Sequence, residues 1–223
     1  MKRFYGLTLL MGAAILLLSG CIRIGGGVGG VQGTGAMVPH EISAEGFTGL
    51  SISGGFDLTF TQAPYFSVTM NIQENLINYL ETPVRGDVLH LGFSRNISTT
   101  GGNTPRINIY APYLDSLDVR GAVNANMVLY VERLDIEVAG AANLNLSGSA
   151  ETLNISAEGA ANIDAFDMTA RDVTVSLEGA GNVDVHATDT LNASLTGVGR
   201  VRYDGDPAVT RSVTGLGTVS RRN

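Results

Sequence analysis

A glycine recurs at a nearly constant spacing through the second half of the chain, and this repeat restricts the fold more than any other feature. The anchor glycines are Gly121, Gly140, Gly159, Gly179, Gly197 and Gly215, which are separated by 19, 19, 20, 18 and 18 residues. The phrases "VAGAAN", "AEGAAN" and "LEGAGN" surround three of them. A fixed period of this length is typical of repeat folds, in which each unit packs only against its neighbours.

Apolar and polar residues alternate strictly within each repeat. In the unit 134–146, every second position is apolar or small, and the same parity recurs in 153–163 and 173–185. A period of two indicates β-strands with one side facing a core. We therefore predict an all-β fold, a single-stranded parallel β-solenoid with rungs of 18–20 residues. Parallel crossovers are almost always right-handed, so we expect a right-handed solenoid.

The anchor glycines share the inward parity, so the repeated phrase predicts a bend where a larger side chain would collide inside. An outward column of Asn lies three residues after the anchors and predicts amide side chains that hydrogen-bond along the stack. The candidate binding face consists of Glu158, Asn162, Asp164, Glu178, Asn182 and Asp184. Two stacked carboxylates about 5 Å apart repel by roughly 1 kcal/mol in water. Solvent, an Arg or a bound Ca²⁺ could offset this repulsion, and a solvated acidic face is the simplest alternative.

The first twenty residues have the pattern of an export signal. Lys2 and Arg3 precede an apolar run over 7–18, which is too short for a membrane span. The sequence "LSGC" that ends at Cys21 resembles a bacterial lipobox, which implies cleavage before Cys21 and acylation (diacylglyceryl and palmitate) of this residue. The alternative is a plain signal peptide with an incidental Cys. Cys21 is the only cysteine, so it forms no internal disulfide, and lipidation accounts for it.

The remaining organisation follows from composition. Residues 1–20 are the predicted signal peptide, and 21–38 are the lipidated Cys with a Gly-rich flexible tether. The solenoid domain spans 39–223, with a less regular part at 39–116 and repeat rungs at 117–219. Because Ile22 and not Asp follows Cys21, resemblance to lipoprotein sorting rules implies the outer membrane, facing either the periplasm or the cell surface.

The net charge limits the class of partner. The whole chain carries −7, and removing Lys2 and Arg3 leaves 12 basic against 21 acidic residues, or −9. Nucleic acid is excluded as a partner because phosphate neutralisation needs a basic surface. The last rungs are basic, and this end either discourages stacking or docks on the acidic middle of another copy, so self-association stays open. The basic residues are Arg200, Arg202, Arg211, Arg221 and Arg222.

Several stretches between 47 and 219 resemble the GIN-domain family of auto-transporter adhesin head domains. They are "LSISGGFDLTFTQ", "ENLINYLE", "GDVLHLGF", "YAPYLDSLDVRGA", the "GAAN" repeats and "GVGRVRYDGDPAVTRSVTGLGTV", and the last of these is the most specific. The resemblance covers nearly the whole mature chain. It implies a β-solenoid that is often exported and lipidated, and it implies no catalytic residues.

Catalytic motifs are scarce in the sequence. The three His residues form no HxH or HExxH pattern, and no Ser lies in a G-x-S-x-G motif. We predict a protein that is not an enzyme: an envelope-anchored lipoprotein for adhesion or scaffolding, with an envelope glycan or protein as ligand. The alternative is a carbohydrate-active β-helix enzyme that uses the paired carboxylates Asp164 and Asp184. The short rungs argue against this alternative, because such enzymes use long loops to wall a cleft.

Overall fold

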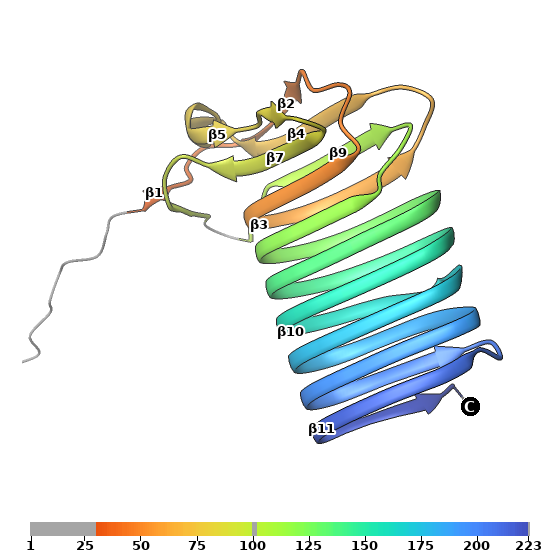
Figure 1. Cartoon of the computed structure of the whole chain (residues 1–223). Helices are drawn as coiled ribbons and strands as arrows, with labels where there is room; N and C mark the ends of the chain where they lie inside the picture. Colours follow the sequence, from red (N-terminus) through yellow and green to blue (C-terminus); the bar gives the residue numbers. More distant parts are fainter. Residues whose placement is uncertain (1–29, 100–101, 223) are drawn as a thin grey trace, which may run out of the picture.

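The alternating second half of the chain forms one continuous strand, β10 (Ser116–Asp204). The computed structural model describes residues 30–99 and 102–222. Figure 1 shows that β10 winds into a stack of turns. It pairs in parallel with β3 (Gly49–Gln62) at one end of the stack and with β11 (Ala208–Arg221) at the other. The chain is therefore all-β in its main part, as predicted.

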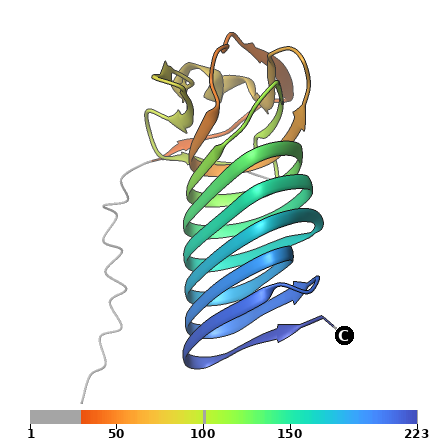
Figure 2. The same cartoon turned by 45° about the vertical axis from the view of Figure 1, so that its right-hand side comes forward.

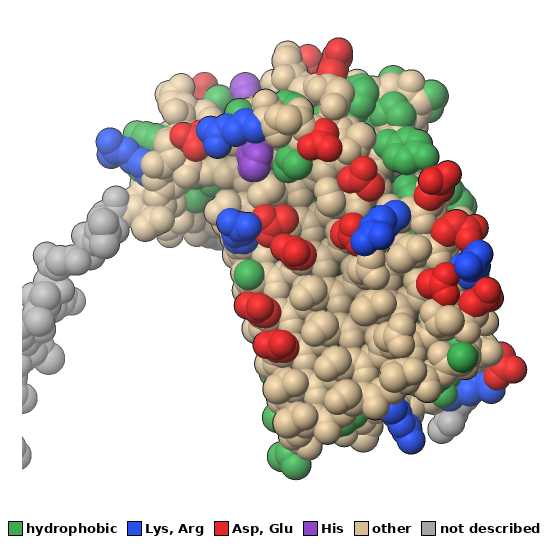
Figure 3. Space-filling view, viewed as in Figure 1, with side chains coloured by type: hydrophobic (Ala, Val, Ile, Leu, Met, Phe, Trp, Pro, Cys, Tyr) green, Lys and Arg blue, Asp and Glu red, His purple; other side chains and the backbone are tan. Residues whose placement is uncertain are grey.

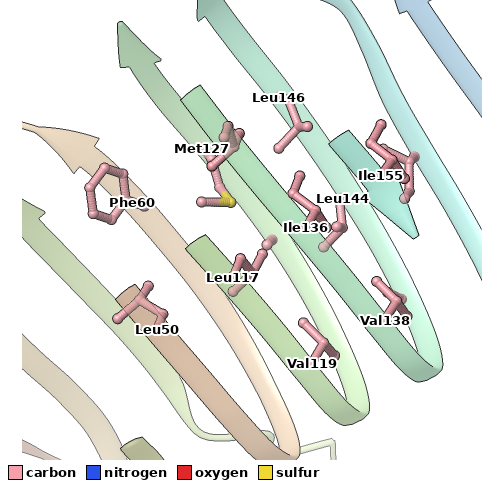
Figure 4. Packing of buried hydrophobic residues seen from close by; sticks show 14 of the residues in the cluster. Leu50, Phe60, Leu117, Val119, Met127, Ile136, Val138, Leu144, Leu146 and Ile155 are labelled. Carbon is pink, nitrogen blue, oxygen red and sulfur yellow. The ribbon is translucent and has the colours of Figure 1, made fainter. Parts of the chain in front are cut away.

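The core lies inside these turns and consists of the residues that share the inward parity. Leu134, Ile136 and Val138 are at most 2% exposed, and so are Leu144 and Leu146 after the bend. Figure 4 shows Ile136 and Leu144 pointing toward one another across the flattened interior. Burying aliphatic side chains contributes about 1.5–3 kcal/mol each relative to exposure, so this parity stabilises the stack.

The anchor glycines form a column that requires glycine for two reasons. Gly159 has φ +114° and Gly179 has φ +131°, which L-residues with a side chain rarely adopt. In addition, a Cβ at Gly159 would collide with the carbonyl oxygen of Gly140 in the preceding turn. The column begins at Gly54 of β3, which is the register partner of Gly121. The alignment of the repeats on these glycines is therefore confirmed.

The less regular part of the chain forms a cap on the first turn. One edge of β3 pairs in parallel with β7 (Val88–Phe93) and then with β9 (Arg106–Ala111). β9 continues antiparallel to β4 (Ser67–Gln73), and β4 pairs antiparallel with β2 (Met37–Ile42). Figure 2 shows the cap at one end of the stack and β11 at the other. The sheet is thus mixed, and the prediction of parallel pairing alone is wrong for this part.

Short elements complete the cap. The sequence "ENLINYLE" becomes a 3₁₀ helix η1 (Glu74–Tyr79) followed by β5 (Leu80–Glu81). β5 and β6 (Val84–Arg85) pair antiparallel with β7. β1 (Val31–Gln32) pairs with β8 (Ile97–Ser98) in a separate two-stranded sheet. No helix in the described part of the chain is long and apolar enough to cross a bilayer.

The start of the domain differs from the predicted boundary. Val31 lies in β1 and pairs with Ile97, although 21–38 is predicted to be a tether. Met37 and Val38 lie in β2 and pair with Gln73 and Ile72 of β4. These apolar residues gain burial by pairing with β8 and β4, which a free tether would not provide. The folded domain therefore begins before residue 39. The predicted signal peptide and the lipidation site Cys21 lie outside the described residues.

Candidate functional site

The bend at each anchor glycine divides the outer surface of the coil into two faces. Face A consists of the outward residues in the segment before each bend, for example the outward ones within 133–139. Face B consists of the outward residues in the segment after each bend, for example those within 143–149. Figure 3 shows face A, where charged side chains lie along both borders of a broad uncharged centre. The centre carries Asn154, Ser156, Thr174, Ser176, Asn192 and Ser194.

The six residues of the predicted binding face are divided between these two faces. Glu158 lies with Asp118 and Glu137 around a shallow hollow on face A, and Glu178 is exposed one turn further along. The other four line a single hollow of about 300 Å³ on face B. They are Asn162, Asp164, Asn182 and Asp184. Parity predicted that all six point outward but not that the bend separates the glutamates from the rest.

The Asn column on face B is a continuous hydrogen-bonded ladder. The Nδ2 of Asn143 donates to the Oδ1 of Asn124 at 2.9 Å, and Asn162 donates to Asn143 at 3.3 Å. Asn182 donates to Asn162 at 3.0 Å. At the cap, Asn124 donates to the carboxylate of Asp57 of β3 at 2.9 Å. Every amide thus donates toward the cap, and the predicted ladder is present.

A second column on face B changes chemistry along the stack. It begins with two amides, since Asn145 donates to Asn126 at 2.9 Å. Asp164 follows, and its carboxylate accepts a hydrogen bond from the backbone N–H of Phe166 at 3.1 Å. The column then reaches Asp184, which is only 8% exposed.

Asp184 is held by Arg202 of the next turn. The Nε of Arg202 donates to Oδ1 of Asp184 at 2.8 Å, and its Nη2 donates to Oδ2, so the pair is bidentate. This hydrogen bond is the main reason that the pKa of Arg202 is raised above its ordinary value. Each oxygen of Asp184 therefore accepts a hydrogen bond from Arg202, and the carboxylate forms one half of an ion pair between adjacent turns. The geometry gives the enzymatic alternative no support.

Aromatic and charged groups close the C-terminal end of face B. The guanidinium of Arg222 lies 4.3 Å from the centre of the Phe166 ring, and that of Arg202 lies 5.3 Å from it. Arg222 also faces Asp204 at 3.9 Å. Cation–π contacts of this kind contribute about 0.5–1 kcal/mol at exposed sites. Of the Arg residues predicted to gather at this end, Arg202 and Arg222 thus contact the Phe166 ring and nearby carboxylates.

A carboxylate with a lowered pKa, that of Asp135, lies on face A. Asp135 accepts a hydrogen bond from the Nε of Arg133 at 2.8 Å and another from the Nδ2 of Asn154 at 2.7 Å. The hydrogen bond from Arg133 is the main cause that lowers the pKa of Asp135 below its ordinary value, while partial burial acts in the opposite direction. The charged form of Asp135 is therefore the form that the fold stabilises.

The geometry offers no cluster of metal ligands among residues 30–99 and 102–222. No group of three or more His, Cys, Asp or Glu side chains there is close enough to hold a metal ion. The stacked Glu158 and Glu178 are exposed to solvent, which screens their repulsion.

Sequence reasoning missed a group of exposed tyrosines where the cap meets the first turn. Tyr65, Tyr110, Tyr113 and Tyr130 are 55%, 37%, 48% and 63% exposed. One signal was present in the sequence, because Val128 and Tyr130 continue the outward parity of Asn124 and Asn126 in β10. Figure 3 shows hydrophobic side chains gathered beside the cap at the border of face A.

Comparisons with known proteins agree with this architecture. A family model described as "Putative auto-transporter adhesin, head GIN domain" matches residues 46–207, more than half of the chain. The chain belongs to this family. Among curated proteins, none matches it.

Solved structures have a similar fold. A protein described as a putative adhesin from Bacteroides fragilis has a TM-score of 0.71 at 22% identity, covering 86% of this chain and 100% of its own. A putative adhesin from Parabacteroides distasonis has a TM-score of 0.58 at 21% identity, with coverages of 87% and 100%. A protein from the same species, described as a putative lipid binding protein, has a TM-score of 0.50 at 21% identity, covering 86% and 99%. At these identities the likeness shows the fold.

Proposed function

We propose that this GIN-domain protein is a non-catalytic adhesin or scaffold of the bacterial envelope that binds its ligand through face B. The coil is the predicted right-handed parallel β-solenoid with rungs of 18–20 residues. The observation that carries the proposal is the continuity of β10, which runs for 89 residues with no inserted loop. A surface without projecting loops has no walls to exclude water from a reaction, but it offers a long flat area for binding.

The anchor is the acylated Cys21, which holds the domain at the outer membrane through several acyl chains. Membership of an adhesin family supports a place at the envelope. Cys21→Ser removes the acylated thiol, so the variant leaves the membrane fraction and incorporates no labelled palmitate. A variant that stays membrane-bound and labelled would contradict the anchor.

Face B can be tested by capture. The full chain in detergent is immobilised and exposed to envelope polysaccharide and protein fractions, first in Ca²⁺ and then in chelator. We expect capture that is lost in the double variant Asn145→Ala/Asp164→Ala on face B. The matched double variant Ser156→Ala/Ser194→Ala on face A should retain it. Equal capture by both variants, or capture by neither variant nor the parent chain, would contradict the proposal. Loss in chelator would add Ca²⁺ to the ligand set, and capture of the chain itself would indicate self-association.

A further inference from the structure

The exposed tyrosines form one platform built from three segments of the chain. Tyr65 lies between β3 and β4, Tyr110 lies in β9, and Tyr130 lies in β10, while Tyr113 follows β9. The rings of Tyr65 and Tyr110 stack with centroids 5.9 Å apart and planes 27° from parallel. Four of the seven tyrosines of the chain thus gather at this junction. Exposed aromatic rings cost solvation free energy, and tyrosine is enriched in binding hot spots.

The segments of the platform are held together by one half-buried amide side chain, that of Gln62. The Nε2 of Gln62 donates to the carbonyl of Pro112 at 2.9 Å, and its Oε1 accepts from the backbone N–H of Tyr130 at 2.6 Å. The N–H of Ala63 donates to the carbonyl of Ala111 at 2.9 Å. Rings that are fixed before binding lose little conformational entropy when a ligand arrives.

The platform lies next to face B, because Tyr130 follows Asn126 and Val128 on the outward side of β10. A hollow of about 420 Å³ lies at Pro64, Pro112 and Tyr130. The next hollow, of about 240 Å³, has Val128 and Asn126 at one side and Asp164 at the other. The third is the hollow of the Asn and Asp columns described above. Aromatic rings therefore lie in one row with amide and carboxylate groups that can each exchange hydrogen bonds with a ligand.

We propose that this row binds a neutral polysaccharide, with sugar rings stacked on the tyrosines and hydroxyl groups hydrogen-bonded along face B. A pyranose ring presents an apolar C–H face to an aromatic ring and a rim of hydroxyls to amides and carboxylates, which matches both halves of the row. The carboxylates of Asp164 and Asp167 beside the hollows repel an anionic polymer. A proline-rich peptide would use the rings but leave the polar hollows unoccupied. This inference rests on the proposed role of face B and adds the ligand class and the tyrosines.

The test uses the full chain in detergent with purified polymers. The neutral probes are amylopectin, galactomannan, xyloglucan and mixed-linkage β-glucan, the anionic probe is polygalacturonate, and the peptide probe is polyproline. Retardation in affinity electrophoresis gives the dissociation constant. We expect at least one neutral probe to bind, and we expect polygalacturonate and polyproline not to bind. Tyr65→Ala and Tyr130→Ala should each weaken binding about tenfold, the effect of a single interface hot spot. Tyr130→Phe retains the ring and should retain most of the affinity.

Two controls separate this inference from folding and from the proposed function. Leu216→Ala removes an apolar side chain that is 81% exposed at the far end of the coil, and it should leave binding unchanged. Thermal melting of each variant shows that the fold is intact. The inference is wrong if no neutral probe binds, if polyproline binds instead, or if both Tyr→Ala variants bind like the parent chain. If one of these results is found but the chain still captures envelope fractions through face B, only the inference about the polysaccharide is wrong. If the chain also captures no envelope fraction, the proposed function is wrong as well.

Discussion

Replacing one anchor glycine by alanine separates two demands that the fold makes on this column. Gly159 has φ +114°, and its new Cβ would meet the backbone of Gly140 in the adjacent turn. Gly54 has nearly the same φ, +120°, but its new Cβ would meet only ring atoms, with the nearest, on Phe56, at 3.5 Å. Gly54→Ala therefore carries the backbone strain alone, whereas Gly159→Ala carries the strain and a collision that only the separation of two turns can relieve.

The expected magnitudes follow from these two contributions. A side chain in a left-handed backbone conformation costs roughly 1–2 kcal/mol, and overpacking against fixed neighbours costs roughly 1–3 kcal/mol. We expect Gly54→Ala to lower the free energy of unfolding by about 1–2 kcal/mol and Gly159→Ala by about 2–5 kcal/mol. Urea denaturation followed by circular dichroism measures both. Equal losses in the two variants would refute the argument that contact between turns requires glycine.

Variants at Asn162, Arg202 and Asp135 test the polar contacts of the coil. Asn162→Ala removes two ladder hydrogen bonds and should lower the free energy of unfolding by about 1–2 kcal/mol, as measured by thermal melting. The control Ser156→Ala on face A should change it by less than about 0.5 kcal/mol. Similar losses in both variants would argue against a structural ladder. Arg202→Met leaves the buried Asp184 carboxylate unpaired and should cost about 1–3 kcal/mol in urea denaturation, part of which a second change, Asp184→Asn, should restore. No restoration in the double variant would contradict the importance of this ion pair. The lowered pKa of Asp135 stabilises the fold above its ordinary pKa of about 3.9, and this contribution is lost as the pH falls below that value. Asp135→Asn should therefore be less stable than the parent chain at neutral pH, and this difference should shrink as the pH falls below that value; a difference that stays constant would contradict the assignment.

The sequence predicted the coil because its information is local and periodic. Alternation alone identified the buried side of Leu134–Val138 and its counterparts, and the glycine period aligned the turns. The amide ladder followed from the same period, since identical residues at equal spacing meet in adjacent turns. These features need no knowledge of distant pairing.

The cap and the tyrosine platform could not be predicted in this way because they depend on pairing between distant segments. One edge of β3 pairs with β7 and with β9, and no repeat in the sequence indicates that these segments are its partners. Tyr65 and Tyr110 meet only because β4 and β9 pair antiparallel. Parity also did not reveal that the bend places Glu158 and Asn162 on different faces.

The direction of the Asn ladder gives the coil an electrical polarity. Each amide points its N–H toward the cap and its carbonyl toward the C-terminal end, so the small side-chain dipoles add along the stack, as peptide dipoles add along a helix. The partial positive pole meets the carboxylate of Asp57, and Arg200 takes the next place in the column after Asn182 at the partial negative pole. A charge of the opposite sign thus lies next to the Asn residues at both poles. Additional turns with Asn at this position would lengthen the column without altering either pole, so the length of the coil can change while its ends stay the same.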